Sequence, residues 1–161
     1  MSEKPFRLAV RAVIRDEQGR CLLLRRSNVC RHFVGKWEWP GGKVDDGEAF
    51  DVALRREARE ETGLEIAPVG VVGAISLEMA DARLVVLCME AELLGGTLNL
   101  SEEHDRHSWV PAAEMPQWDL TSGLKELAEA YVAGKRRGGK SHRRSVTDSE
   151  SARKPGRGGE R

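Results

Sequence analysis

The sequence lacks long apolar segments and holds few cysteines, and each absence excludes a class of protein. No uninterrupted apolar run approaches the roughly 18 residues of a membrane-spanning helix, and the opening MSEKPFRLAV lacks the charged-then-apolar order of a signal peptide. The cysteines Cys21, Cys30 and Cys88 form no C-x-x-C pair, which indicates free thiols in a reducing compartment. We therefore expect a soluble cytoplasmic protein.

A formal net charge of zero conceals two regions of opposite sign. Positions 135–161 hold ten Lys or Arg and three Asp or Glu, which leaves 16 basic and 23 acidic residues in positions 1–134. The segment 135–161 has one aliphatic and no aromatic residue, too little apolar surface to offset the entropy of ordering. It is predicted to be a disordered basic tail after a domain of residues 1–134. The tail is either a solvated extension or a contact for nucleic acid.

The region before the tail alternates strand and helix patterns. Apolar and β-branched runs predict strands at 7–15, 21–26, 69–78, 82–93 and 107–110. Apolar residues at a helical period predict a helix over 122–134, ending at Gly134. Strands combined with separate helices imply a layered α/β or α+β domain.

A further helix is predicted from about Gly47 to Thr62. Asp45 stands three residues before Glu48, which matches a capping box at the start. Gly63 suits the left-handed residue that ends a helix. Both boundaries therefore have a local physical cause.

Three glutamates, Glu57, Glu60 and Glu61, share one face of this predicted helix. Like charges at that spacing repel by roughly 0.2–0.5 kcal/mol if exposed, and the negative end of the helix disfavours anions by roughly 0.3–1 kcal/mol. A divalent cation would turn this repulsion into binding, and carboxylate ligands suit Mg²⁺ or Mn²⁺. The alternative is a solvated face whose charges are partnered by the nearby arginines.

The preceding stretch WPGGKVDDGE adds a feature typical of phosphate sites. Gly41 and Gly42 let the backbone approach a ligand closely, and Lys43 can meet a phosphate. Carboxylates beside a basic, glycine-rich loop suit a phosphorylated substrate, which Mg²⁺ normally accompanies.

The stretch from Gly42 to Leu64 resembles the complete Nudix box, and its flanks WEWPGGK and LLLRRS resemble the MutT-like branch of the Nudix hydrolases. After Gly42 the box positions are Glu48, Arg56, Glu57, Ala58, Arg59, Glu60, Glu61, Thr62, Gly63 and Leu64. The resemblance implies an α/β fold, an α/β/α sandwich with a mixed central β-sheet. It also implies Mg²⁺-dependent hydrolysis, with Mn²⁺ as a substitute, of a nucleoside diphosphate linked to another moiety. In the MutT-like branch a nucleoside triphosphate, often oxidised, yields the monophosphate and pyrophosphate.

The resemblance also assigns metal-binding and catalytic residues. The metal ligands would be the carbonyl of Gly41 and the carboxylates of Glu57, Glu60 and Glu61. Arg56 would orient Glu57 and pair with Glu48. A glutamate would accept the proton of the attacking water, either Glu60 or a carboxylate of the later loop LSEEHDRHSW, where Glu103 is preferred to Glu102. The two histidines of that loop, His104 and His107, are predicted to lie on the surface.

Four residues are candidates for contact with the nucleotide. Lys43 would contact a phosphate, and Arg26, the second arginine of LLLRRS, would lie by the nucleotide. Trp39 would either contact a base or lie in the core. Asp119 in MPQWDL would either accept hydrogen bonds from the N–H groups of a purine or belong to the start of the last helix.

The sequence leaves the substrate and the assembly open. Hydrolysis of ADP-ribose, of another nucleotide sugar or of a dinucleoside polyphosphate is an alternative, as is a Nudix module that senses a nucleotide without cleaving it. Because the box is intact, an enzyme is preferred. Both a monomer and a homodimer are compatible with the sequence.

Overall fold

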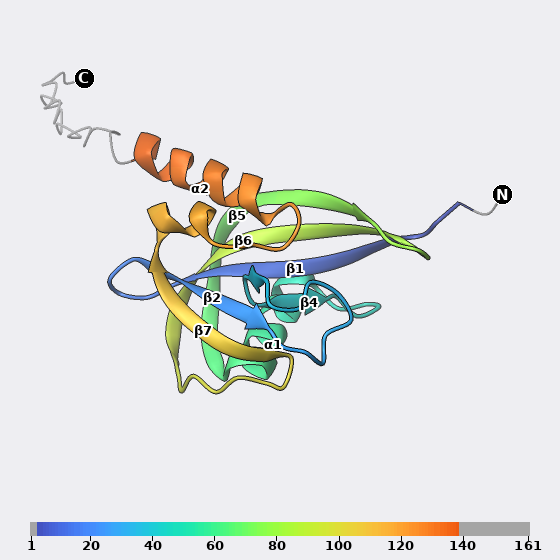
Figure 1. Ribbon diagram of the computed structural model, residues 1–161, viewed down its shortest axis with the longest axis horizontal. Coiled ribbons are helices and arrows are strands. Elements are labelled where there is room, and N and C mark those ends of the chain that lie inside the picture. Colours follow the sequence, from blue (N-terminus) through green and yellow to red (C-terminus); the bar gives the residue numbers. More distant parts are fainter. Residues whose placement is uncertain (1–2, 139–161) are drawn as a thin grey trace, which may run out of the picture.

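The computed structural model describes residues 3–138 and contains one seven-stranded sheet (Figure 1). In chain order its elements are β1 (Phe6–Arg15), β2 (Arg20–Arg26), β3 (Trp37–Glu38), β4 (Gly41–Lys43), α1 (Phe50–Thr62), β5 (Leu64–Glu78), β6 (Arg83–Gly96), β7 (His104–Pro111), the 3₁₀ helix η1 (Ala112–Gln117) and α2 (Leu124–Gly138). The basic segment from residue 139 onward lies outside the described residues, and so does most of the predicted tail.

The sheet is mixed, as predicted. Its strands follow the order β3-β2-β1-β6-β5, with β4 added to β1 and β7 added to β2. Strands β1 and β6 run parallel, and the other pairs are antiparallel. The parallel pair is possible because α1 and β5 intervene between β1 and β6, which provides the long connection that parallel strands need.

The two helices cover opposite faces of the sheet, so the predicted α/β/α sandwich is confirmed (Figure 1). Helix α1 buries Ala53, Leu54 and Ala58 against one face, and α2 buries Leu124, Leu127, Ala128 and Tyr131 against the other. Strand β1 serves both cores, because successive side chains of a strand point to opposite faces. Val10 faces α1, and Ala9 and Val13 face α2.

The boundaries of α1 agree with the sequence at its end but not at its start. Gly63 has a φ of 72° and donates its N–H to the Arg59 carbonyl at 2.8 Å, so the predicted stop is confirmed. The helix begins at Phe50, and its N-cap residue, Ala49, makes no side-chain bond. Only half of the predicted capping box forms, since Glu48 Oε2 accepts the Asp45 N–H at 3.0 Å before the helix begins.

The largest of the other boundary differences are in β5 and α2. Strand β5 begins at Leu64, five residues before the predicted strand, and accommodates Pro68 at a register shift. Helix α2 passes the predicted end at Gly134 and reaches Gly138. Lys135 then pairs with Glu90 of β6 at 2.8 Å, which ties this last turn to the sheet.

Cys21, Cys30 and Cys88 form no disulfide, as predicted. Burial raises the pKa of the Cys21 thiol to about 12 and that of Cys88 to about 11, so neither is a reactive thiolate at neutral pH. Between residues 3 and 138, no helix combines the length and the apolar character that crossing a membrane requires.

Candidate functional site: the box glutamates and the adjoining cavity

Strand β4 brings two glycines directly against the glutamates of α1. The N–H of Gly41 donates to Glu61 Oε2 at 2.9 Å. A Cβ added to Gly42 would lie 2.5 Å from the carboxylate of Glu57. Gly41 has a φ of 155°, and a Cβ there would meet the Val10 carbonyl oxygen at 1.9 Å. Gly42 is therefore required by the close approach of the Glu57 carboxylate, and Gly41 by its φ and by the close approach of the β1 backbone at Val10.

Arg56 is the centre of the ion pairs on α1. Its Nε and Nη2 donate to the two carboxylate oxygens of Glu48, at 2.8 and 2.9 Å. Its Nη1 donates to Glu57 at 2.9 Å and to Glu60 at 3.2 Å, and Nη2 also reaches the Lys43 carbonyl at 3.1 Å. The hydrogen bond from Arg56 lowers the pKa of Glu48 to about 2. One guanidinium therefore binds both the start of α1 and two of the three clustered glutamates.

The three glutamates have different environments. Glu61 is 5% exposed, and burial raises its pKa to about 8, although the Gly41 N–H and the charge of Arg11 act in the opposite direction. Burial also raises the pKa of Glu57, against the hydrogen bond from Arg56. The side chain of Glu60 is 58% exposed. The buried carboxylates are thus poorly solvated as anions, and a cation would stabilise their charged forms.

The carboxylates fit a divalent cation in chemistry, but they are not gathered around a single point. Within residues 3–138, no three His, Cys, Asp or Glu side chains stand in an arrangement that could hold a metal ion. Glu57 and Glu60 turn to Arg56, and Glu61 turns to the Gly41 N–H. The donor set consists of hard oxygens, which suit Mg²⁺ or Mn²⁺.

A cavity of about 170 Å³ opens on the α2 side of the sheet. Apolar side chains of β5, β6 and α2 form much of its lining, among them Ile75, Leu77, Leu84, Val86 and Leu124. Arg11, Arg26 and Glu38 form a charged part of the wall, and Phe33 also lines the cavity. An apolar pocket with a few charged groups is typical of a small-molecule site.

Glu38 joins this charged wall into one network. It is 2% exposed, and its carboxylate lies 3.0 Å from Arg11 Nη2, 2.8 Å from Arg26 Nη1 and 3.0 Å from His104 Nε2. Burial opposes ionisation, but Arg11, His104 and Arg26 together lower the pKa of Glu38 to about 2. The prediction that His104 lies on the surface is wrong, because β7 begins at His104 and pairs it with Arg26 of β2. The exposed position of His107 is confirmed.

Residues 5–131 match the NUDIX domain family. The chain belongs to the Nudix family. CTP pyrophosphohydrolase of Escherichia coli K12 is 34% identical over 127 residues, which cover 78% of this chain and 92% of the relative. 8-oxo-dGTP diphosphatase of Proteus vulgaris is 29% identical over 86 residues, 53% of this chain and 75% of that protein. A crystal structure of a MutT protein from Methanosarcina mazei Go1 superimposes with a TM-score of 0.76 at 31% identity, covering 84% of this chain and 99% of the other. Two Mycobacterium tuberculosis relatives are 38% identical over 87 residues, and the chain spans only 61% of their length.

Two of the predicted nucleotide contacts of this Nudix protein, Trp39 and Asp119, do not line the cavity, and the contact of Asp119 stays a prediction. Trp39 is fully buried in the core on the α2 side, and its Nε1–H points to the Met115 sulfur at 3.4 Å. It is therefore a core residue, and the prediction that it contacts a base is wrong. Asp119 pairs with Lys36 at 2.6 Å and does not line the cavity. Neither does Asp119 start the last helix, which begins at Leu124.

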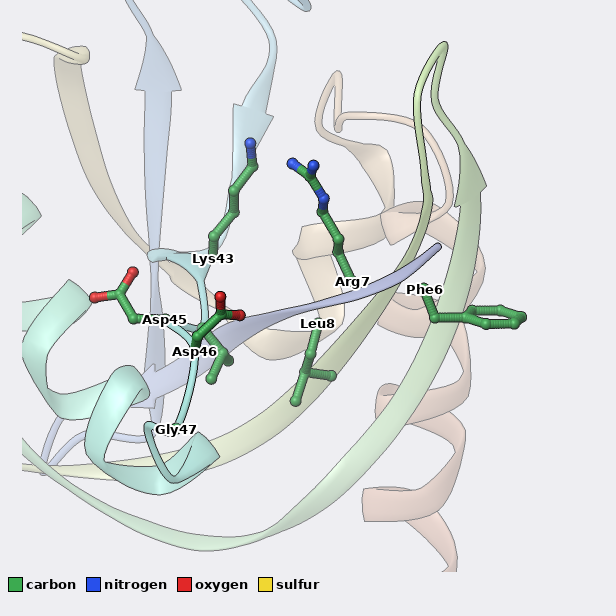
Figure 2. A pocket seen from close by; sticks show the side chains of 8 residues that line it. Phe6, Arg7, Leu8, Lys43, Asp45, Asp46 and Gly47 are labelled. Atoms are coloured by element: carbon green, nitrogen blue, oxygen red, sulfur yellow. The ribbon is translucent and has the colours of Figure 1, made fainter. Parts of the chain in front are cut away.

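The other two residues predicted to contact the nucleotide, Arg26 and Lys43, line separate pockets. Arg26 lines the cavity and donates to Glu38 and to the His32 carbonyl, each at 2.8 Å. Lys43 lines a separate open cleft of about 540 Å³. Figure 2 shows the Lys43 and Arg7 side chains projecting from this cleft in the same direction, as the pairing of Lys43 with Ala9 across β4 and β1 requires.

Glu103 approaches the Nudix glutamates from the loop before β7. The carbonyl of Glu103 accepts the Ser27 N–H at 2.9 Å, and Glu103 is exposed. The charge of Glu103 contributes to the raised pKa of Glu57, although less than burial does. The charge of Glu103 is therefore felt at Glu57 although the two residues are far apart in the sequence, and the role of Glu103 as a base stays a prediction.

Proposed function

We propose that this Nudix protein is a divalent-metal-dependent hydrolase that cleaves a nucleoside triphosphate, oxidised forms included, to the monophosphate and pyrophosphate. The observation that carries this proposal is the contact of Glu61 and Glu57 with the glycine pair of β4. Residues 38–45 run from the apolar cavity, past Glu61 and Glu57, to the cleft of Lys43. A nucleotide matches this order, with its nucleoside in the apolar cavity and its phosphates at the glutamates and Lys43.

The metal would be Mg²⁺, with Mn²⁺ as a substitute, held by the Gly41 carbonyl and by Glu57, Glu60 and Glu61. When bound, the ion would neutralise phosphate charge and acidify a water molecule. Glu60 is exposed and accepts the proton of the attacking water in this proposal, with Glu103 as the alternative base.

The remaining residues of the site position these groups. Arg56 fixes the direction of the Glu57 carboxylate through the bond from Nη1. Lys43 projects from the end of β4 and contacts a phosphate oxygen of the substrate. Arg26 lines the cavity and adjoins the nucleoside.

The substrate class is supported by the names of the relatives. CTP pyrophosphohydrolase and 8-oxo-dGTP diphosphatase both denote hydrolysis at a nucleotide phosphate. The chain spans only part of the Mycobacterium tuberculosis relatives, so its own activity rests on assay. We also propose that the protein is cytoplasmic, with the catalytic domain in residues 1–134.

A nucleotide panel at fixed Mg²⁺ tests the proposal. We expect pyrophosphate release from a triphosphate, including CTP or 8-oxo-dGTP, and no release in EDTA. Glu60→Gln should lower the rate by about 10²–10⁴-fold with the fold retained. Glu65→Gln is a matched control, since Glu65 pairs with Arg59 just after the helix and should leave the rate unchanged.

Three outcomes would replace the proposal. AMP released from ADP-ribose in preference to triphosphate cleavage would indicate a nucleotide-sugar or ADP-ribose hydrolase. Cleavage restricted to dinucleoside polyphosphates would indicate that class instead. Nucleotide binding without hydrolysis at any metal concentration would indicate a sensing module.

A further inference from the structure

Arg11 is a charged residue at a strand position whose neighbours on the same face lie in the core. On β1 it stands between Ala9 and Val13, which share its face of the sheet and belong to the core under α2. Its side chain is only 20% exposed. A charge at such a place is costly unless partners satisfy it, and positions that violate a local rule in this way are often functional.

The contacts of Arg11 with the protein use only some of the N–H groups of its guanidinium. Nη1 donates to the Trp39 carbonyl at 2.7 Å, and Nη2 lies 3.0 Å from Glu38 Oε2. The guanidinium carries more N–H groups than these two contacts use. Arg11 also lines the cavity, so its remaining donors are available to a ligand there.

The charged wall of the cavity has a surplus of positive charge. The Glu38 carboxylate is the shared counter-ion of Arg11 and Arg26, at 3.0 and 2.8 Å. Two guanidiniums and one carboxylate leave a net charge of +1, and the other walls of the cavity are largely apolar. An anionic group entering the cavity would be attracted strongly, because the surroundings screen the charge poorly.

Arg11 also lies where the cavity meets the box. In the sheet register it is opposite Gly41, whose N–H holds Glu61. A nucleotide with its nucleoside in the cavity and its phosphates at the glutamates would pass this side chain at the first phosphate.

We propose that Arg11 binds the phosphate group that adjoins the nucleoside, with Glu38 holding the guanidinium in place. The inference rests on the proposed function and adds a phosphate-binding residue that lies outside the Nudix box. If Arg11 served only in an internal ion pair, the protein would bind a nucleoside and its monophosphate with equal affinity.

The test compares each nucleoside with its 5′-monophosphate in EDTA, where no metal contributes to binding. Cytidine and CMP form one pair, and deoxyguanosine and dGMP form the other, with affinities from NMR titration. We expect wild-type protein to bind at least one monophosphate more tightly than its nucleoside. Arg11→Met should lower the monophosphate affinity by roughly 10- to 100-fold and leave the nucleoside affinity unchanged.

Two further variants separate this role from folding and from net charge. The double variant Arg11→Met with Glu38→Gln removes the buried carboxylate together with its partner, and Arg26 alone keeps the cavity at the same formal charge. It should also lose the preference for the monophosphate. Arg25→Met is the control, since Arg25 pairs with Asp105 at 2.7 Å and does not line the cavity, and it should behave as wild type.

The inference is overturned if wild type shows no preference for a monophosphate, or if a folded variant lacking Arg11 keeps that preference. Its failure is distinguishable from failure of the proposed function. A protein that hydrolyses triphosphates while Arg11→Met keeps the preference would refute only the role of Arg11. A protein that hydrolyses no nucleotide would refute the proposed function itself.

Discussion

Replacing Glu61 with glutamine should remove a pH-dependent destabilisation of the metal-free protein. Glu61 is 5% exposed, and burial raises its pKa from 4.5 to about 8. The folded state therefore holds this proton more tightly than the unfolded chain does. Glutamine keeps the shape and the oxygen that accepts the Gly41 N–H, but it carries no titratable proton.

The sign and size of the effect follow from linkage. Because the folded pKa is the higher one, the contribution of Glu61 is fully favourable below about pH 4.5 and is lost as the pH rises toward 8. One pKa unit corresponds to about 1.4 kcal/mol, so the full loss is roughly 5 kcal/mol. Between pH 5.5 and 7.5 the loss should be about 2.5 kcal/mol.

Urea unfolding in EDTA at several pH values measures this loss. The free energy of unfolding of wild type should fall by about 2.5 kcal/mol more than that of Glu61→Gln across the window from pH 5.5 to 7.5. Comparing the two proteins cancels the contributions of the groups that they share. Glu60→Gln serves as the control, because it removes a charge from the exposed side of the same turn and should keep the wild-type slope. Equal slopes for wild type and Glu61→Gln would refute the reasoning.

Three other substitutions probe the fold and the site. Glu38→Gln should lower the free energy of unfolding in urea by about 3–5 kcal/mol, because it leaves two arginines without their buried counter-ion; a loss below 1 kcal/mol would contradict this. Gly42→Ala should reduce the hydrolysis rate far more than the Tm, because the new Cβ, 2.5 Å from the Glu57 carboxylate, would displace that flexible group; an unchanged rate would contradict this. Gly63→Ala should lower stability by at least about 1–2 kcal/mol in thermal unfolding, since its φ is 72° and its Cβ would meet the Thr97 carbonyl oxygen at 2.5 Å; an unchanged Tm would contradict this.

Local rules made much of this fold predictable. The end of α1 at Gly63 depends on a backbone conformation that glycine adopts readily, and the strand β1 was indicated by a run of apolar and β-branched residues. The glycine pair before the box signalled a close backbone approach, which the contacts with Glu61 and Glu57 bear out. Each of these predictions depends on residues that are close together in the sequence.

The cavity wall was not predictable in the same way. His104 reaches Glu38 across 66 positions of sequence, through the pairing of β7 with β2. Trp39 is buried against Met115, 76 positions away. An aromatic residue beside a glycine loop and a histidine in a polar loop have the same local sequence whether they are buried or exposed. The one local signal was Arg11, a charge among apolar residues on a core strand.

The repulsion expected among Glu57, Glu60 and Glu61 is relieved in this structure without a metal. Arg56 donates hydrogen bonds to Glu57 and Glu60 and neutralises their charge. Glu61 adds little negative charge, because its pKa of about 8 keeps its carboxyl group protonated at neutral pH. A dication must displace that proton before Glu61 can ligate it, because metal ligands bind deprotonated. The affinity for Mg²⁺ or Mn²⁺ should therefore rise by about tenfold per pH unit between pH 6 and 8 and level off above it. Calorimetry in buffers of different ionisation enthalpy should detect release of close to one proton at pH 7, and an affinity independent of pH over this range would show that metal binding does not displace a proton from Glu61.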